Sequence, residues 1–279
     1  YRGLETGDRS VASYVLQQGQ IRFVVSAATV RDHEIAAHTH KHGDGVAVIA
    51  LEVPDAGYAY QYALSKGATG VQELTAVKDD HGELRYSIIQ GYGDTQFKFV
   101  DRSAYNGPFA PGYDARDKVE GRLHDGFGLA SVDHVVGNVE LGGMDRWVKF
   151  FEEVMGFSML VHFDEDDIST EYSALMSKVV QDGTGKVKFP INEPAEGRRK
   201  SQIQEYLDYY GGPGVQHIAL TTGDIIKTVS ELRARGIEFL HVPGTYYENL
   251  TERVGDIKES IDQIAELNIL VEGEGEAPQ

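Results

Sequence analysis

The 279-residue chain contains no cysteine, and it has only 26 lysines and arginines against 44 aspartates and glutamates. Without thiols it can form no disulfide and no thiolate nucleophile, and any bound metal must be held by histidine, carboxylate or water. The formal net charge of -18 argues against a nucleic-acid or anionic-membrane partner, because both are polyanions that attract lysine and arginine. The sequence has no signal-like opening and no long apolar run, so we expect a cytoplasmic protein.

An internal repeat organises the chain. Residues 43–70 match residues 212–239 without a gap, and the clearest stretch reads GDGVAVIAL in the first copy and GPGVQHIAL in the second. Each copy predicts a strand, an aspartate near a helix start, an amphipathic helix, a glycine that stops the helix, and another strand. In the second copy Ile225, Val229 and Leu232 share one predicted buried face of the helix.

A third segment has the same organisation. LASVDHVVGNV predicts a strand, residues 145–155 predict a helix with Trp147, Phe151 and Val154 on one face, and Gly156 predicts its end. Further strands are predicted around TEYSALMSKVV and KVKFPINEP, which completes a β-α-β-β-β module. We therefore predict an α+β fold built from paired β-α-β-β-β modules.

The two ends of the chain depart from this pattern. The first half has strands in RSVASYVLQQG and IRFVVSA and a hairpin in LRYSIIQGYG and TQFKFVDR, but no strand and helix precede them. By internal symmetry we expect a strand and a helix to be missing at the start and one or two strands at the end. Divergence of the terminal modules is the alternative, although it would leave open sheet edges.

The stretch YNGPFAPGYDARDKVEGRLHDG is rich in glycine, proline and charge, and it predicts an interdomain linker. The predicted division is an N-terminal scaffold domain at residues 1–110, a linker at 111–128 and a C-terminal catalytic domain at 129–279.

Two histidines lie on the first strands of the two modules of the second half, His134 in SVDHVVGNV and His217 in GVQHIAL. If the modules pack as a pseudosymmetric pair, both imidazoles can point into one cavity and ligate one metal. A lone histidine in an apolar strand is more often a hydrogen-bonded core residue. The equivalent positions of this pair favour a metal site, as does Val48 in place of His217 in the first copy. We infer an active cavity in the second half and a scaffold in the first.

The other histidines give weaker signals. HEIAAHTHKH invites a zinc interpretation, but His33 and His38 are five residues apart, whereas the helical zinc spacing HExxH needs four. We interpret this run as a solvated helix that leads into a strand. His81 and His124 lie in polar loops, and we expect His162 and His241 to be structural or exposed.

Four uncharged polar residues lie on or beside strands near the expected cavity: Ser177, Asn192, Gln202 and Gln216. A buried amide needs a hydrogen-bond partner, so each can serve either the protein or a ligand. Ser201 fits the first position of a capping box, SQIQ, at the start of the helix QIQEYLDYY.

These motifs together resemble a known family. SVDHVVGNVELGGMDRWVKFFEEVMGF, STEYSALMSKVV, INEP followed by KSQIQEYL, and GVQHIAL are similar to 4-hydroxyphenylpyruvate dioxygenase of the vicinal-oxygen-chelate superfamily. The similarity is dense over the last half and looser through VASYVL, HGDGV and YNGPFAPGY. No single fragment is specific, but the set is. The resemblance implies two vicinal-oxygen-chelate (glyoxalase/bleomycin-resistance-like) half-barrel domains.

The resemblance further implies a non-haem Fe(II) enzyme that converts 4-hydroxyphenylpyruvate and O2 to homogentisate and CO2 in tyrosine and phenylalanine catabolism. Iron in the family is held by two histidines and one glutamate, and His134 and His217 match the two histidines. The glutamate belongs to a strand that corresponds to TQFKFVDR of the first half, so we expect it beyond Gln279. We therefore expect weak iron binding and no turnover from the 279 residues by themselves.

By the same resemblance, Ser177, Asn192, Gln202 and Gln216 match positions that line the substrate cavity. The aromatic substrate carries its own 2-oxo acid, which chelates the iron, so no separate 2-oxoglutarate is needed. The resemblance also implies a homo-oligomer, either a dimer or a tetramer.

Alternative functions stay open. Hydroxymandelate synthase shares the fold, the iron and the substrate but hydroxylates the benzylic carbon, and only product analysis separates the two. The chain could also be a non-catalytic binding protein of the superfamily or an inactive fragment, because no carboxylate in the sequence is an evident substitute for the glutamate. Glu266 and the residues of EGEGE lie near the end, in what we expect to be a flexible tail.

Overall fold

The computed structural model describes residues 1–116, 126–163, 169–170, 173–195, 200–255 and 257–271, and from 161 to 175 it describes backbone alone. The chain forms two compact units, one of Tyr1–Glu120 and Val132–Leu220 and the other of Gly121–Ser131 and Thr221–Gln279. No helix among the described residues is both long enough and apolar enough to cross a membrane. Much of the predicted linker and the EGEGE tail lie outside the described residues, and so does His124.

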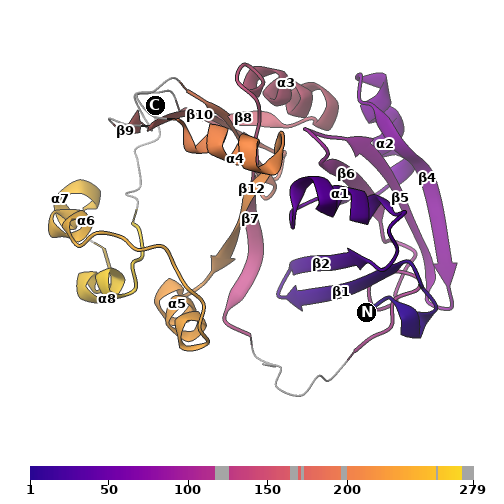
Figure 1. The fold of residues 1–279 in the computed structure, drawn as a ribbon, viewed down its shortest axis with the longest axis horizontal. Coiled ribbons are helices and arrows are strands. Elements are labelled where there is room, and N and C mark those ends of the chain that lie inside the picture. The colour runs from indigo at the N-terminus through magenta and orange to yellow at the C-terminus, as the bar shows by residue number, and fades with distance from the viewer. Residues whose placement is uncertain (117–125, 164–168, 171–172, 196–199, 256, 272–279) are drawn as a thin grey trace. The chain divides into compact units, whose positions relative to one another are not determined.

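The first unit contains one complete module from the first half of the sequence (Figure 1). Its elements are β3 (Val48–Glu52), α2 (Ala56–Ser65), β4 (Gly70–Asp79), β5 (Gly82–Gln90) and β6 (Gln96–Asp101). The strand order is β3-β6-β5-β4, with β3 parallel to β6 and the other neighbours antiparallel. Asp55 caps α2, because its carboxylate accepts from the backbone N–H groups of Gly57 and Tyr58.

The second complete module repeats this topology. Its elements are β7 (Leu129–Asn138), α3 (Met144–Met155), β8 (Ser158–Phe163), β9 (Ser169–Thr170), β10 (Ser173–Gln181) and β11 (Lys188–Pro194). The sheet order is β12-β7-β11-β10-β8, where β12 (Gly214–Thr222) begins the next module and β9 pairs with β10. β7 is parallel to β11, as β3 is to β6. The predicted α+β fold of β-α-β-β-β modules is confirmed, and its described sheets do not close into a barrel.

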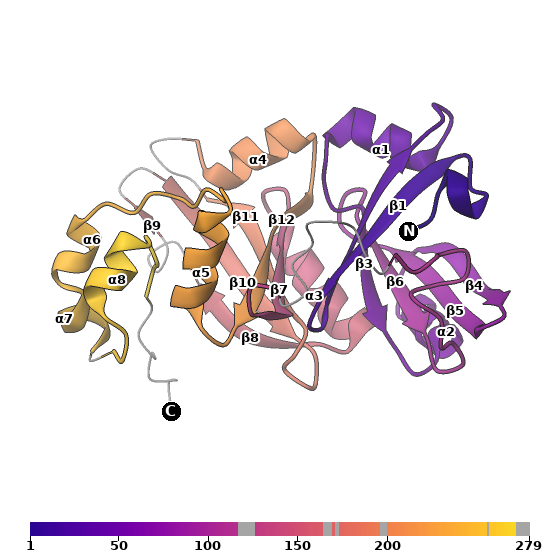
Figure 2. The ribbon, with the colours of Figure 1, turned by 90° about the horizontal axis from the view of Figure 1, so that it is seen from below.

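A helix precedes the first strand of two of the modules. α1 (Glu34–His42) leads into β3, and α4 (Gln202–Tyr210) leads into β12. The two helices lie side by side (Figure 2). Before α1 come a short 3-10 helix at Leu4–Thr6 and a two-stranded antiparallel sheet of β1 (Val11–Gln18) and β2 (Ile21–Ala28).

The interpretation of the histidine run as a solvated helix is wrong for its last residue. His42 is buried because α1 packs against α4, and its ring stacks on Tyr210 with centroids 4.2 Å apart. Nδ1 lies 2.6 Å from the backbone carbonyl oxygen of Tyr210, and Nε2 lies 2.8 Å from the carboxylate of Asp94. Both ring nitrogens therefore face acceptors, and His42 joins the first half of the chain to the second.

One hydrophobic core serves the modules of both halves. Phe97 of β6 contacts Phe151 of α3 and Phe189 of β11, with ring centroids 5.5 and 5.7 Å apart. All three rings are almost completely buried. On α3 the predicted face is confirmed, because Phe151 and Val154 are buried and Trp147 packs against the core. Burial of this aromatic surface stabilises the unit.

The turn between β5 and β6 enters the second module. The Tyr92 ring lies against the backbone of Gly137 on β7, where a Cβ would meet Cζ at 2.7 Å. At Gly93, which has a positive φ of 56°, a Cβ would lie 2.2 Å from the carbonyl oxygen of Pro213. The two glycines thus allow a close approach that no larger residue permits.

The second unit contains α5 (Ile225–Ala234), α6 (Thr245–Glu248), α7 (Leu250–Val254) and α8 (Ile261–Glu266). α5 is capped by Asp224, but its predicted buried face is only partly formed, because Val229 is buried and Ile225 is exposed. The strand predicted after Gly236 is wrong, since residues 237–244 contain none. The first-half equivalent, β4, is held by β5, whereas the described residues after 244 form short helices and no partner strand.

Candidate metal and substrate site

The structure brings His134 and His217 together. They lie on the neighbouring strands β7 and β12, their ring centroids are 5.7 Å apart, and the rings are inclined by 75°. Histidine nitrogens bind metal ions at about 2.0 to 2.1 Å, so two rings at this separation can share one ion. His134 is partly buried, and His217 is the more exposed of the two.

Hydrogen bonds fix which nitrogen of each ring is available. His134 donates from Nδ1 to Oδ2 of Asp133 at 2.7 Å, and His217 donates from Nδ1 to Oε1 of Gln216 at 2.8 Å. Because a carboxylate and an amide oxygen can only accept, each Nδ1 carries a proton in the neutral ring. The lone pair is then on Nε2, for which no described residue supplies a hydrogen bond. This arrangement is typical of metal-binding histidines.

The electrostatics favour the neutral imidazole of His217. Partial burial, and then the proximity of His134, lowers the pKa of His217. The neutral ring is the form that binds a metal ion. The pKa of Asp133 is also lowered, first by the hydrogen bond from His134 and further by Lys188, whose Nζ lies 2.9 Å from Oδ1.

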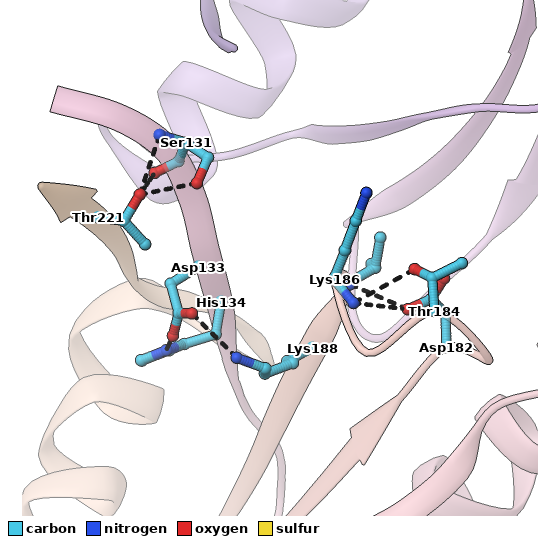
Figure 3. A network of polar contacts seen from close by, with 9 residues as sticks. Ser131, Asp133, His134, Asp182, Thr184, Lys186, Lys188 and Thr221 are labelled. Carbon is cyan, nitrogen blue, oxygen red and sulfur yellow. Dashed lines mark hydrogen bonds and ion pairs between the residues drawn. The ribbon is translucent and has the colours of Figure 1, made fainter. Parts of the chain in front are cut away.

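The histidines fit an Fe(II) site as two of its ligands. Within the described part of the chain, no third histidine, aspartate or glutamate joins them in a group able to hold a metal ion. Asp133 is near, but its carboxylate binds Nδ1 of His134 and Lys188 instead (Figure 3).

Two of the four predicted substrate residues are side by side. Ser177 of β10 pairs with Asn192 of β11, and Asn192 pairs with Asn138 of β7. All three are buried, and the amide of Asn192 donates to Oδ1 of Asn138 at 3.4 Å. Asn138 lies four residues after His134, so both side chains point to the same face of the sheet. The structure therefore assembles a polar row on the histidine face.

Asn138 was missed by the sequence interpretation. It is fully buried, and its amide nitrogen has no partner among the described residues. An unsatisfied buried donor is costly unless a ligand or water occupies it. The available signal was the asparagine at the end of an apolar strand, at an even spacing from His134.

The other two predicted residues are placed differently. Gln202 is the first residue of α4 and is exposed, while Gln216 uses its amide oxygen on His217. Ser201 caps α4 as predicted, accepting from the N–H of Ile203 at 3.2 Å. The full capping box is not formed, because the Gln204 side chain donates to Asp208.

The side chain of Glu193, the residue after Asn192, lies on the opposite face of the sheet. Its buried carboxylate accepts from the backbone N–H of Met144, the first residue of α3, at 2.9 Å. It therefore caps α3 and is not a ligand of this site.

Comparison with known proteins first defines the class. Residues 131–262 match the Glyoxalase/Bleomycin resistance protein/Dioxygenase superfamily, and residues 6–114 match the N-terminal domain of hydroxyphenylpyruvate dioxygenase. The two matches place the chain in this superfamily, and the repeated β-α-β-β-β modules agree with them.

The particular family follows from closer relatives. The chain is 43% identical to 4-hydroxyphenylpyruvate dioxygenase of Yarrowia lipolytica, over 98% of this chain and 72% of that protein. It is 44% identical to the enzyme of that name from Dictyostelium discoideum, over 98% of this chain and 76% of that protein. A solved mutant of 4-hydroxymandelate synthase from Streptomyces coelicolor superimposes with a TM-score of 0.80 at 27% identity, covering 96% of this chain and 74% of that one. The chain belongs to the 4-hydroxyphenylpyruvate dioxygenase family.

Proposed function

We propose that this protein is an Fe(II) dioxygenase that converts 4-hydroxyphenylpyruvate and O2 to homogentisate and CO2 in tyrosine catabolism. The observation that carries the proposal is identity of 41 to 44% to dioxygenases of this name over 98% of the chain. The paired histidines support it, because their Nε2 atoms have no hydrogen-bond partner among the described residues and can supply two ligands of a two-histidine, one-carboxylate iron site. The third ligand stays a prediction, a glutamate outside the described residues.

Bound iron would supply a Lewis-acidic centre at which the substrate's 2-oxo acid and O2 meet. His134 and His217 would hold it through Nε2, with their rings oriented by Asp133 and Gln216. Binding and orientation of the substrate are assigned to polar residues near the histidines.

The polar row on the histidine face is the proposed substrate-orienting surface. Ser177 and Asn192 are buried, so hydrogen bonds from their side chains act with little competition from water. Gln216 has its amide nitrogen left to donate while its oxygen holds His217, and Gln202 lies at the exposed start of α4. We assign all four to orientation of the aromatic ring and the side chain of the substrate.

Product analysis tests the reaction. The assay uses the protein as it is produced by its source organism. It is supplied with Fe(II), 4-hydroxyphenylpyruvate and O2, O2 uptake is recorded, and the products are separated by chromatography. We expect one homogentisate and one CO2 for each O2 consumed. If 4-hydroxymandelate forms instead, the synthase function replaces the proposed one. The greater identity to the dioxygenases favours homogentisate.

Substitution tests the orienting role. Asn192→Ala and Gln216→Ala should each lower kcat/KM for 4-hydroxyphenylpyruvate by about 10- to 100-fold, because a buried or site-facing hydrogen bond is worth on the order of 1 to 3 kcal/mol. Asp208→Ala, which removes an exposed partner of Gln204 on α4, serves as the control and should keep full turnover. Unchanged rate and product in both site variants would remove the orienting role.

The cytoplasmic location and the dimeric or tetrameric state also stay proposals. Sedimentation at several protein concentrations measures the oligomeric state.

A further inference from the structure

In the two histidines of the candidate site, Nδ1 has hydrogen-bond partners of different chemical type. Nδ1 of His134 binds a carboxylate, that of Asp133, whereas Nδ1 of His217 binds the neutral amide oxygen of Gln216. In both pairs the partner is the residue immediately before the histidine. Successive side chains of a regular strand point to opposite faces, so strand alternation alone does not bring either pair together.

At His134, a lysine from the neighbouring strand binds the carboxylate that accepts the histidine's hydrogen bond. Lys188, the first residue of β11, is the register partner of His134 on β7. Its Nζ lies 2.9 Å from Oδ1 of Asp133, while Oδ2 of the same carboxylate accepts from His134 at 2.7 Å (Figure 3). The side chains of Lys188 and Asp133 are 28% and 36% exposed, so the pair is only partly screened by solvent.

We propose that Asp133, held in place by Lys188, is a positioning residue that fixes the Nδ1–H form of His134 and directs Nε2 to the metal. This inference rests on the proposed function for the identity of the metal site. A carboxylate that accepts from a histidine ligand orients the ring and makes it a stronger donor. A charge-assisted bond is about twice as strong as a neutral one, so His134 is the better fixed of the two ligands.

Two readouts test the inference on the protein as it is produced by its source organism, because the proposed third ligand lies outside the described residues. The first is the long-range 1H–15N spectrum of the imidazoles in metal-free protein, which separates protonated from unprotonated ring nitrogens. The His134 signals are assigned by their loss in His134→Ala. The second is the dissociation constant for Co(II), a spectroscopic probe for Fe(II), measured by anaerobic titration.

We expect Asp133→Ala to convert His134 from the single Nδ1–H form to a mixture, and to raise the Co(II) dissociation constant by about 10- to 100-fold. Asp133→Asn leaves an amide whose oxygen can stay on Lys188 while its NH2 donates to Nδ1, so this variant should also lose the single Nδ1–H form and bind Co(II) more weakly. Lys188→Met should weaken Co(II) binding less than Asp133→Ala does. Asp145→Asn makes the same chemical change at a carboxylate that binds Lys178, and it should alter neither readout.

An unchanged His134 spectrum and an unchanged Co(II) affinity in Asp133→Ala would overturn the inference and leave the proposed function intact. If unaltered protein binds no Co(II), the proposed function fails, and with it the role of Asp133 at a metal site.

Discussion

At the scale of single residues, two of the buried polar groups without a partner in the described structure bear on the site and its support. They are the hydroxyl of Tyr92 and the amide nitrogen of Asn138. Asn138 adjoins Asn192 on the histidine face, so a ligand can satisfy it. Tyr92 is enclosed between β7 and the aromatic core, and burial raises the pKa of its hydroxyl far above the ordinary value. This hydroxyl is therefore a neutral donor that has no acceptor among the described residues.

Removal of the Tyr92 hydroxyl should stabilise the folded state. We expect Tyr92→Phe to raise the free energy of unfolding by about 1 kcal/mol, since an unsatisfied buried polar group costs on the order of 1 to 3 kcal/mol. Tyr206→Phe is the matched control, because that hydroxyl donates to the carbonyl of Val215 at 2.9 Å and its loss should lower the free energy of unfolding. Urea unfolding measures both. A destabilised Tyr92→Phe would show that the hydroxyl has a partner.

At the scale of elements, the β5–β6 turn links the scaffold module to the strands that carry the histidines. Tyr92 abuts Gly137 on β7, three residues after His134, and Gly93 abuts Pro213, four residues before His217. The first half of the chain thus sets the position of both histidine strands. This gives the scaffold a role in the site although it supplies no ligand.

Gly93→Ala tests that link. The substitution combines a positive φ with a backbone clash at Pro213, and we expect it to lower the free energy of unfolding by more than about 2 kcal/mol. Gly67→Ala has a φ of 96° but open space around its Cβ, so it should show only the smaller conformational cost. Equal losses in the two variants, measured by thermal or urea unfolding, would mean that the turn does not press on Pro213.

Local pattern predicted most elements of the fold but not their environments. The strand of His134, the helix with Phe151 and Val154 on its inner face, and the aspartate caps all follow from periodicity and capping. Burial of His42 does not, because it depends on α4, which lies far along the chain. The strand expected after Gly236 failed for a related reason, since an apolar run becomes a strand only where a neighbour pairs with it.

The candidate site shows the same limit. The histidine pair could be predicted, because equivalent positions in a repeat are read directly from the sequence. The register that aligns Ser177, Asn192 and Asn138 could not, since no local signal fixes the pairing of β7 with β11. The partners of the ring nitrogens likewise depend on side-chain geometry that the sequence pattern does not determine.

At the scale of the larger unit, one core ties together modules from both halves. Phe97 belongs to the first half, while the rings of Phe151 and Phe189 that surround it belong to the second. Trp147, the only tryptophan of the chain, lies beside this core and reports on the second half. The two halves should therefore unfold together.

We expect Phe97→Ala to destabilise the fold by about 3 to 5 kcal/mol, as large-to-small changes in a core do. Tryptophan fluorescence should show the loss although Phe97 lies in the other half of the sequence. Tyr58→Ala, at a side chain that is 70% exposed on α2, should change the free energy of unfolding by less than about 0.5 kcal/mol. If the unfolding transition reported by tryptophan fluorescence were the same in Phe97→Ala as in the unaltered protein, the two halves would have separate cores.

We propose above all that His134 and His217 hold one metal ion between them. The most direct measurement is anaerobic Fe(II) binding at equilibrium by the unaltered chain and by His134→Ala and His217→Ala, with His38→Ala as a control outside the site. We predict one ion per chain, weakened by at least tenfold in each site variant and unchanged in the control. Binding that is equal in all four proteins would contradict the claim.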